Sequence, residues 1–220
     1  MSSTAPEKRR NGDALNYLVD ALRTRPWARR AVSALSIALV LVGVGLLGYP
    51  FATNLWQDRL QSRLDRQLAS PELKQAYQER RVKTGDSLTR IKIPKLGVDV
   101  VVVEGTSASA LKAGAGHYPQ TPLPCEVGNM AIAGHRTTYG KPFANLDKLG
   151  QGDLIILETP IGACTYEVDP GPFVVGNKDF SVINPTADRT LTLTTCHPKG
   201  SARQRLVVKG KFLHNGSADA

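Results

Sequence analysis

The chain has 220 residues, of which 41% are hydrophobic and 21% are charged, the balance of a globular protein long enough to bury a core. A net charge of +9 would suit a nucleic-acid-binding protein, but residues 1–30 alone hold seven Lys or Arg against three Asp or Glu, a net charge of +4. A basic segment beside an apolar run is typical of a membrane-topology signal, so no nucleic-acid partner is expected.

The first predicted element is an apolar helix. Residues 31–49 carry no charged side chain, and the next charged residue is Asp58. Nineteen helical residues span about 28 Å, close to the hydrocarbon thickness of a bilayer. We therefore predict a transmembrane anchor at 31–51. Three arginines adjoin its N-terminal side: Arg25, Arg29 and Arg30.

The positive charges predict the orientation of this anchor. By the positive-inside rule, residues 1–30 are a cytoplasmic segment and the rest of the chain is extracellular. A cleaved signal peptide is the alternative, but its apolar core would be shorter and would end in a small-x-small cleavage site. The pattern favours a single-pass protein of the cell membrane.

Residues 52–87 are polar, with large apolar residues at four-residue spacing before a break at Ser70-Pro71. This spacing predicts a narrow helical stripe. We interpret the segment as a juxtamembrane stalk; the alternative is a helix that pairs with another copy or with lipid head groups. The stripe comprises Trp56, Leu60, Leu64 and Leu68.

From residue 88 to 213 the pattern changes to short apolar or alternating runs separated by turn residues, which is typical of strands. Short helices are expected within 107–116 and at 141–149, and the tail 214–220 is expected to fray. Many strands with few helices predict a mainly β domain, a closed or nearly closed barrel. The predicted strands are 89–94, 99–105, 128–135, 153–159, 163–175, 190–196 and 205–212, with 153–159 and 163–175 forming a hairpin.

The three cysteines are Cys125, Cys164 and Cys196. Outside the cytoplasm thiols tend to pair, and an odd number leaves one over. If strands 128–135 and 190–196 end at the same rim, Cys125 and Cys164 both fall at the opposite rim. A disulfide between them and two separate buried thiols both remain open.

Cys196 is the candidate nucleophile. A nucleophilic cysteine needs a nearby cation that favours the thiolate, a proton donor for the leaving group and donors for the oxyanion. His135 ends the strand AIAGH, and Arg205 begins the strand after the cysteine turn. Taken singly, each has an ordinary structural reading: a packed thiol, a hydrogen-bonded strand-end histidine and a solvated arginine.

The other histidines have weaker patterns. His197 follows Cys196 and would point the opposite way in an extended chain. His117 is a candidate to line a groove, and His214 lies in the tail. HExxH, CxxC and glycine-rich phosphate-loop motifs are absent from the sequence, so neither a metal nor a nucleotide cofactor is expected.

The segment GHYPQTPLPCEVGNMAIAGHRTTYGKPFANLDKL, followed by TLTLTTCHP and an arginine nine positions after the cysteine, resembles the sortases, most closely those of class E from high-GC Gram-positive bacteria. The resemblance covers roughly 88–213 and implies an eight-stranded barrel. It also implies a catalytic triad of Cys196, His135 and Arg205. Arg203 is a rival to Arg205, because both lie on one face of an extended strand.

The resemblance also implies a substrate. Tyr118 is similar to a groove tyrosine associated with Leu-Ala-X-Thr-Gly (LAXTG) over Leu-Pro-X-Thr-Gly (LPXTG) sorting signals, and Thr194 and Thr195 are expected to bind substrate beside the cysteine. The expected reaction is cysteine transpeptidation, with exported proteins bearing a C-terminal signal as donors and a lipid II-type cell-wall precursor amine as acceptor. Two alternatives stay open: an L,D-transpeptidase-like enzyme acting on peptidoglycan, and a non-catalytic membrane-tethered binding module.

Overall fold

The computed structural model describes residues 16–17, 19–20 and 24–216, with the side chains of 49–56 excepted. Contacts divide the chain into two units, residues 1–52 and 53–220. Trp56, the first residue of the predicted stripe, lies among the side chains outside this description. Each unit is described by itself.

The N-terminal unit contains the first part of helix α2 (Pro26–Leu68). Its segment Pro26–Gly48 has a mean hydropathy of 2.4, and the large apolar side chains along it are exposed. A helix of this length and composition is compatible with a single-pass membrane anchor. Proline opens the helix, where the missing N–H leaves no hydrogen bond unmade. The orientation of the anchor and the boundaries at 31–51 stay predictions.

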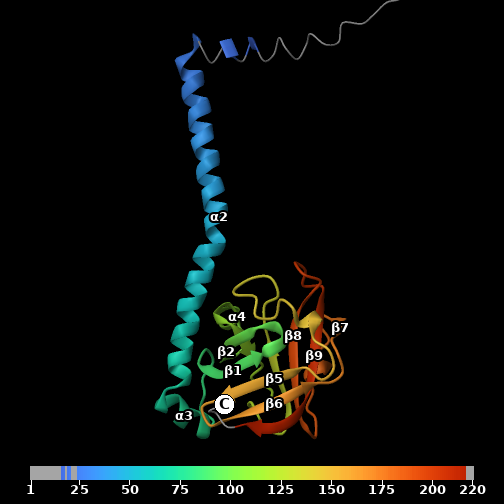
Figure 1. Ribbon diagram of the computed structural model, residues 1–220. Helices are drawn as coiled ribbons and strands as arrows, with labels where there is room; N and C mark the ends of the chain where they lie inside the picture. Colours follow the sequence, from blue (N-terminus) through green and yellow to red (C-terminus); the bar gives the residue numbers. More distant parts are fainter. Residues whose placement is uncertain (1–15, 18, 21–23, 217–220) are drawn as a thin grey trace, which may run out of the picture. The chain divides into compact units, whose positions relative to one another are not determined.

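The second unit is a closed eight-stranded barrel, as predicted. The strands follow the order β6-β5-β1-β2-β3-β4-β8-β9, and pairing of β6 with β9 closes the circuit (Figure 1). The pairs β2–β3 and β4–β8 are parallel and the others antiparallel. A ninth strand, β7 (Phe173–Gly176), pairs with β9 outside this circuit. The eight strands of the barrel are β1 (Ser87–Ile93), β2 (Val98–Glu104), β3 (Ala115–His117), β4 (Gly128–Ala133), β5 (Leu154–Thr159), β6 (Gly162–Val168), β8 (Arg189–His197) and β9 (Gln204–Gly216).

The barrel interior is apolar because alternate residues of each strand point inward. Met130 and Ile132 of β4 and Leu191 and Leu193 of β8 are fully buried in one core cluster. The outer face of β4 is covered as well, since the amide of Asn129 donates to carbonyl oxygens of the segment after β7. The helices that follow α2 are short: α3 (Pro71–Gln78), α4 (Ala108–Ala113), and the 3-10 turns η1 (Pro94–Leu96), η2 (Leu146–Lys148) and η3 (Ser181–Ile183).

Two predicted elements differ in detail from the structure, and one strand was not predicted. The helix expected at 141–149 is reduced to η2, because Phe143 turns into the core and its N–H donates to the His135 carbonyl oxygen at 3.1 Å. The strand expected at 163–175 is interrupted after Val168, where Pro170 has no N–H for a ladder. Its second part, β7, pairs with the first half of β9. The three-residue strand β3 was too short to be predicted.

The C-terminal strand is longer than expected. β9 continues to Gly216, three residues into the segment predicted to fray. Pairing with Ala163–Thr165 of β6 orders these residues and extends the β6–β9 pairing that closes the barrel. Residues 217–220 lie outside the described chain.

The leucines of the predicted stripe pack on the barrel of the same chain. Leu64 is buried against Val101 and Val103 of β2. The Gln61 side chain accepts a hydrogen bond from the Val101 N–H at 2.8 Å, a donor that the short strand β3 does not reach. The end of α2 is thereby a component of the barrel's outer packing. The division of the chain at residues 52 and 87 stays a prediction.

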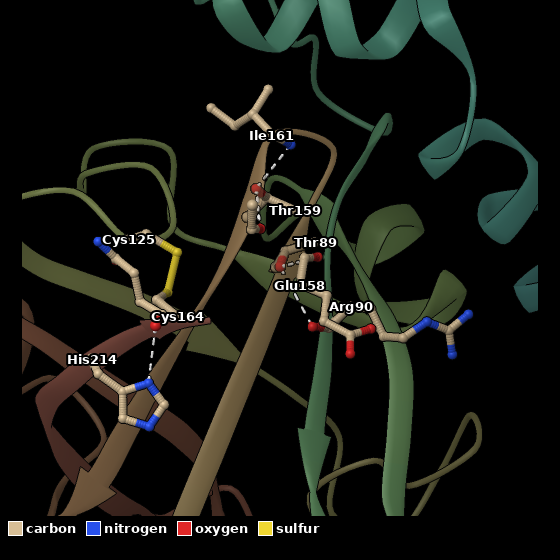
Figure 2. The surroundings of a disulfide bond; sticks show 10 residues. Thr89, Arg90, Cys125, Glu158, Thr159, Ile161, Cys164 and His214 are labelled. Atoms are coloured by element: carbon tan, nitrogen blue, oxygen red, sulfur yellow. Dashed lines mark hydrogen bonds between the residues drawn. A yellow bond between two sulfur atoms is a disulfide. The ribbon is translucent and has the colours of Figure 1, made fainter. Parts of the chain in front are cut away.

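The structure pairs Cys125 with Cys164 in a disulfide, with their Cα atoms 5.7 Å apart (Figure 2). Cys125 lies just before β4, and Cys164 lies within β6. The parallel pairing of β4 with β8 places the C-terminal ends of both strands at one rim, so Cys125 lies at the other. Of the two interpretations left open by the sequence, the disulfide is confirmed.

Candidate active site

Cys196 is the cysteine left free, and its side chain is half-buried near the end of β8. Leu191 and Leu193 face the barrel interior, so by alternation Thr195 faces inward as well and Cys196 lies on the outer face. A thiol at the end of a strand on the outer face is open to a peptide laid along the barrel.

Arg205 lies directly opposite Cys196 in the antiparallel pair β8–β9. Its Nη1 approaches the sulfur to 3.7 Å and also donates to the carbonyl oxygens of Ala202 and Gln204, both at 3.1 Å. These backbone acceptors fix the guanidinium beside the sulfur. Because residues opposite one another in an antiparallel pair are neighbours, the nine-residue spacing reflects the strand register.

The rival arginine lies elsewhere. Arg203 precedes β9, its side chain is exposed, and its backbone N–H donates to the hydroxyl of Ser201 at 3.3 Å. Within the part of the chain that the structure describes, the guanidinium in contact with the Cys196 sulfur is that of Arg205.

His135 comes to the same rim because β4 and β8 run parallel. Their register ends with Ala133 opposite Thr194. The chain then continues alongside β8, since the Gly134 N–H donates to the Thr194 carbonyl oxygen at 3.0 Å and the Thr195 hydroxyl donates to the Gly134 carbonyl oxygen at 2.8 Å. His135 and Cys196 each follow one residue later.

The His135 ring is half-buried against the Tyr139 ring, with centroids 5.1 Å apart. Burial lowers the pKa of His135 below its ordinary value of 6.5, because a charged imidazolium is less well solvated there. The free protein at neutral pH therefore holds this histidine mostly as neutral imidazole. Gly134 before it is required by packing, since a Cβ would lie 2.4 Å from the Phe143 ring.

The three residues expected to bind substrate separate onto two faces. The Tyr118 hydroxyl is hydrogen-bonded to the Thr194 hydroxyl at 3.1 Å, and Thr194 shares the outer face with Cys196. Thr195 faces inward and commits its hydroxyl to Gly134. Thr194 and Tyr118 thus lie on the same face as Cys196, while the Thr195 side chain joins the cysteine strand to the histidine strand.

Sequence reasoning missed Arg136, the third residue of the GHR motif. Its side chain is 5% exposed, and Nη1 donates to His197 Nδ1 at 2.9 Å and to the Cys196 carbonyl oxygen at 3.3 Å. Nη2 pairs with Asp147 at 3.0 Å. Although partial burial opposes it, hydrogen bonds from the Asp147 backbone and Arg136 hold the pKa of Asp147 below its usual value. Arg136 belongs to the GHR motif, but the sequence does not show which residues a basic side chain after a strand will contact.

The remaining histidines lie away from the sulfur. His117 is 1% exposed, with Nδ1 2.7 Å from a Glu104 carboxylate oxygen and Nε2 3.0 Å from the Pro122 carbonyl oxygen. It is therefore a buried structural residue and does not line a groove. His214 lies on β9 opposite Thr165. Among the described residues, no group of three His, Cys, Asp or Glu side chains is arranged to hold a metal ion.

A closed barrel with a free cysteine on its outer face, an arginine beside the sulfur and a histidine at the same rim defines a class of β-barrel proteins equipped for thiol chemistry. The family model described as "Sortase domain" matches residues 91–213, more than half of the chain. The protein belongs to the sortase family.

Relatives agree with this assignment. The chain is 28% identical over 212 residues to Sortase SrtE1 of Streptomyces coelicolor, which covers 87% of this chain and 60% of that protein. The structure of sortase E from Streptomyces avermitilis is 36% identical, with a TM-score of 0.58 over 62% of this chain and 94% of that one. A Clostridium perfringens Sortase D5 transpeptidase is 31% identical, with a TM-score of 0.63 over 72% and 98%. The chain thus spans less than two thirds of the length of SrtE1 but nearly the whole of both solved domains, and the similarity to sortase E proteins agrees with the class E resemblance.

Proposed function

We propose that this protein is a membrane-anchored cysteine transpeptidase that cleaves a sorting signal between Thr and Gly and transfers the exported protein to an amine of a cell-wall precursor. The observation that carries the proposal is the free Cys196 thiol with the Arg205 guanidinium 3.7 Å from its sulfur. Sortase family membership and the transpeptidase named among its structural relatives support the same reaction.

In the proposed first step, Cys196 transfers its proton to His135, and the thiolate attacks the carbonyl carbon of the Thr–Gly bond. Arg205 stabilises both the thiolate and the oxyanion of the tetrahedral intermediate, because a guanidinium donates through several N–H groups and stays charged. The C–N bond then breaks, and the imidazolium of His135 gives its proton to the leaving glycine amine. The product is a thioester between Cys196 and the signal threonine.

In the second step, an amine attacks the thioester carbonyl while neutral His135 takes a proton from the attacking nitrogen. The intermediate collapses, the new amide forms and Cys196 leaves as the thiolate. The proposed acceptor is a lipid II-type precursor at the outer surface of the membrane. The apolar segment at 26–48 is compatible with an anchor that keeps the enzyme near such a precursor.

We further propose that Tyr118 and Thr194 contact the signal, which is an LAXTG- or LPXTG-like motif. Both hydroxyls lie on the face of Cys196 and bond to each other, so they form a polar rim beside the nucleophile. No observation favours the L,D-transpeptidase or binding-module alternatives over membership of the sortase family.

Mass spectrometry of the full chain in detergent with fluorescent Leu-Ala-Glu-Thr-Gly and Leu-Pro-Glu-Thr-Gly peptides tests this function. We expect a covalent adduct of Cys196 with the N-terminal part of the peptide and release of the glycine fragment. Cys196→Ala is expected to form no adduct and release no fragment. Near-normal cleavage by that variant would refute the proposed reaction.

A further inference from the structure

The carbonyl oxygen of Cys196 lies at an edge of β8 where the strand ladder stops. Register between β4 and β8 ends at Ala133 and Thr194, followed by the bond from the Gly134 N–H to the Thr194 carbonyl oxygen. In a parallel ladder, the next acceptor on this edge is two residues further along, at Cys196. The donor there is the Arg136 side chain, whose Nη1 lies 3.3 Å from that oxygen.

Arg136 is held at both ends of its guanidinium. Its Nη2 pairs with Asp147, which lies on η2, and its Nη1 reaches His197 as well as Cys196. With 5% exposure and its Nη groups directed at protein atoms, this arginine is not free to bind a substrate carbonyl. It joins the η2 turn to the last two residues of β8.

The contact with Arg136 also defines the tautomer of His197. A guanidinium has no acceptor, so His197 Nδ1, 2.9 Å from Arg136, must accept the hydrogen bond. His197 is then a neutral imidazole with its proton on Nε2. This gives the residue after the cysteine a role that the sequence did not reveal: it accepts from Nη1, the same nitrogen that lies beside the Cys196 carbonyl oxygen.

We propose that Arg136 and His197 are positioning residues for the nucleophile. This inference rests on the proposed function. Between them they hold the Cys196 backbone on the edge facing β4, while β9 pairs with the opposite edge and Arg205 contacts the sulfur. Without the hydrogen bond from Arg136, the Cys196 carbonyl oxygen has no partner on the β4 side, and the sulfur moves relative to His135. A misplacement of about 1 Å can reduce turnover about 100-fold without weakening substrate binding.

The matched variants His197→Ala and His197→Asn test the proposal in the full-length protein. Asn places an acceptor oxygen near the position of Nδ1, whereas Ala removes the acceptor. With whichever of the two pentapeptide motifs the parent cleaves, we expect His197→Ala to lower kcat about tenfold with KM changed less than twofold. His197→Asn is expected to recover most of kcat. Equal kcat for both variants and the parent would overturn the proposal, and so would equal losses in both accompanied by equal losses of thermal stability.

Two further measurements complete the test. Nitrogen-15 NMR of labelled histidine should show a neutral His197 with its proton on Nε2 in the parent, and the opposite tautomer would contradict the bond from Arg136. Arg136→Lys, which retains a charge but not the two-ended guanidinium, should lose kcat at least as strongly as His197→Ala; parent-like kcat in this variant would also overturn the proposal. Failure of the proposed function can be distinguished from failure of this inference. If the proposed function is wrong, Cys196→Ala retains activity, whatever the effect of the His197 variants.

Discussion

The Arg205 guanidinium and the Cys196 sulfur face each other across the antiparallel pair β8–β9, with Nη1 3.7 Å from Sγ. The backbone oxygens of Ala202 and Gln204 accept from the same nitrogen, so the cation is held in place before any substrate binds. Preorganised charge of this kind is effective because no reorganisation is needed when the oxyanion forms.

Arg205→Ala is accordingly expected to lower kcat/KM for the sorting-signal peptide by about 10²- to 10³-fold, the effect of losing one oxyanion donor. Arg203→Ala is the matched control, because it removes the same charge two residues earlier from an exposed side chain. We expect it to retain activity within about twofold. Steady-state peptide cleavage measures both variants, and a larger loss in Arg203→Ala would reverse the assignment of the arginine.

The pKa of His135 predicts the acid limb of the activity profile. In the proposed reaction, Cys196 and His135 share one proton, and a second proton on the imidazole prevents transfer from the thiol. Burial lowers the pKa of His135 below 6.5, so the singly protonated pair persists to lower pH than it would with an ordinary histidine. We expect the midpoint of the acid limb of kcat/KM to lie below pH 6.5.

A pH series of kcat/KM checks this expectation, with the unfolding midpoint measured at each pH as the control. An acid limb centred above pH 6.5, in protein that remains folded, would contradict the effect of burial on His135.

The Cys125–Cys164 disulfide is expected to stabilise the fold without taking part in the reaction. It closes a loop of sequence separation 39, for which the chain-entropy estimate is about 4 kcal/mol of unfolding free energy. The double variant Cys125→Ala/Cys164→Ala should lose up to this amount in a urea titration. Its rate of Cys196 alkylation by iodoacetamide under folding conditions should match that of the parent, because the disulfide lies at the opposite rim.

Thiol counting provides the control. The oxidised protein should incorporate one iodoacetamide per chain, at Cys196, and the reduced, unfolded chain three. A slower alkylation of Cys196 in the folded double variant would show that the disulfide influences the nucleophile.

Leu64 predicts a measurable role for the end of α2 in barrel stability. The side chain is 5% exposed and packs against Val101, Val103 and Ala110. Leu64→Ala should lower the unfolding free energy by about 2–3 kcal/mol, within the range for a leucine removed from a packed site. Arg63→Ala, on the exposed side of the same helix, should change it by less than about 0.5 kcal/mol. Equal effects in the two variants would show that the helix does not pack on β2 in solution.

Much of this protein follows from its sequence. The charge-free run after Arg30 identifies a helix of membrane-spanning length, and the short apolar runs from residue 88 onward identify a series of strands, because both depend on the local hydrophobic pattern. The chemistry of a thiol made His135 and Cys196 candidates, and their motifs were recognisable because they resemble those of the sortases. Arg205 was predicted from the resemblance, and the β8–β9 register, which places Arg205 and not Arg203 opposite Cys196, separates it from its rival.

Only the tertiary structure decided which distant residues meet. The disulfide joins residues 39 positions apart, Gln61 satisfies a β2 backbone donor 40 positions away, and Arg136 reaches His197 across 61 positions. These contacts depend on strand order and register, which are set by closure of the whole barrel and not by the pattern of any one segment. For that reason the chemistry at the sulfur is visible in the sequence, while the residues that hold the sulfur in place become visible only in the fold.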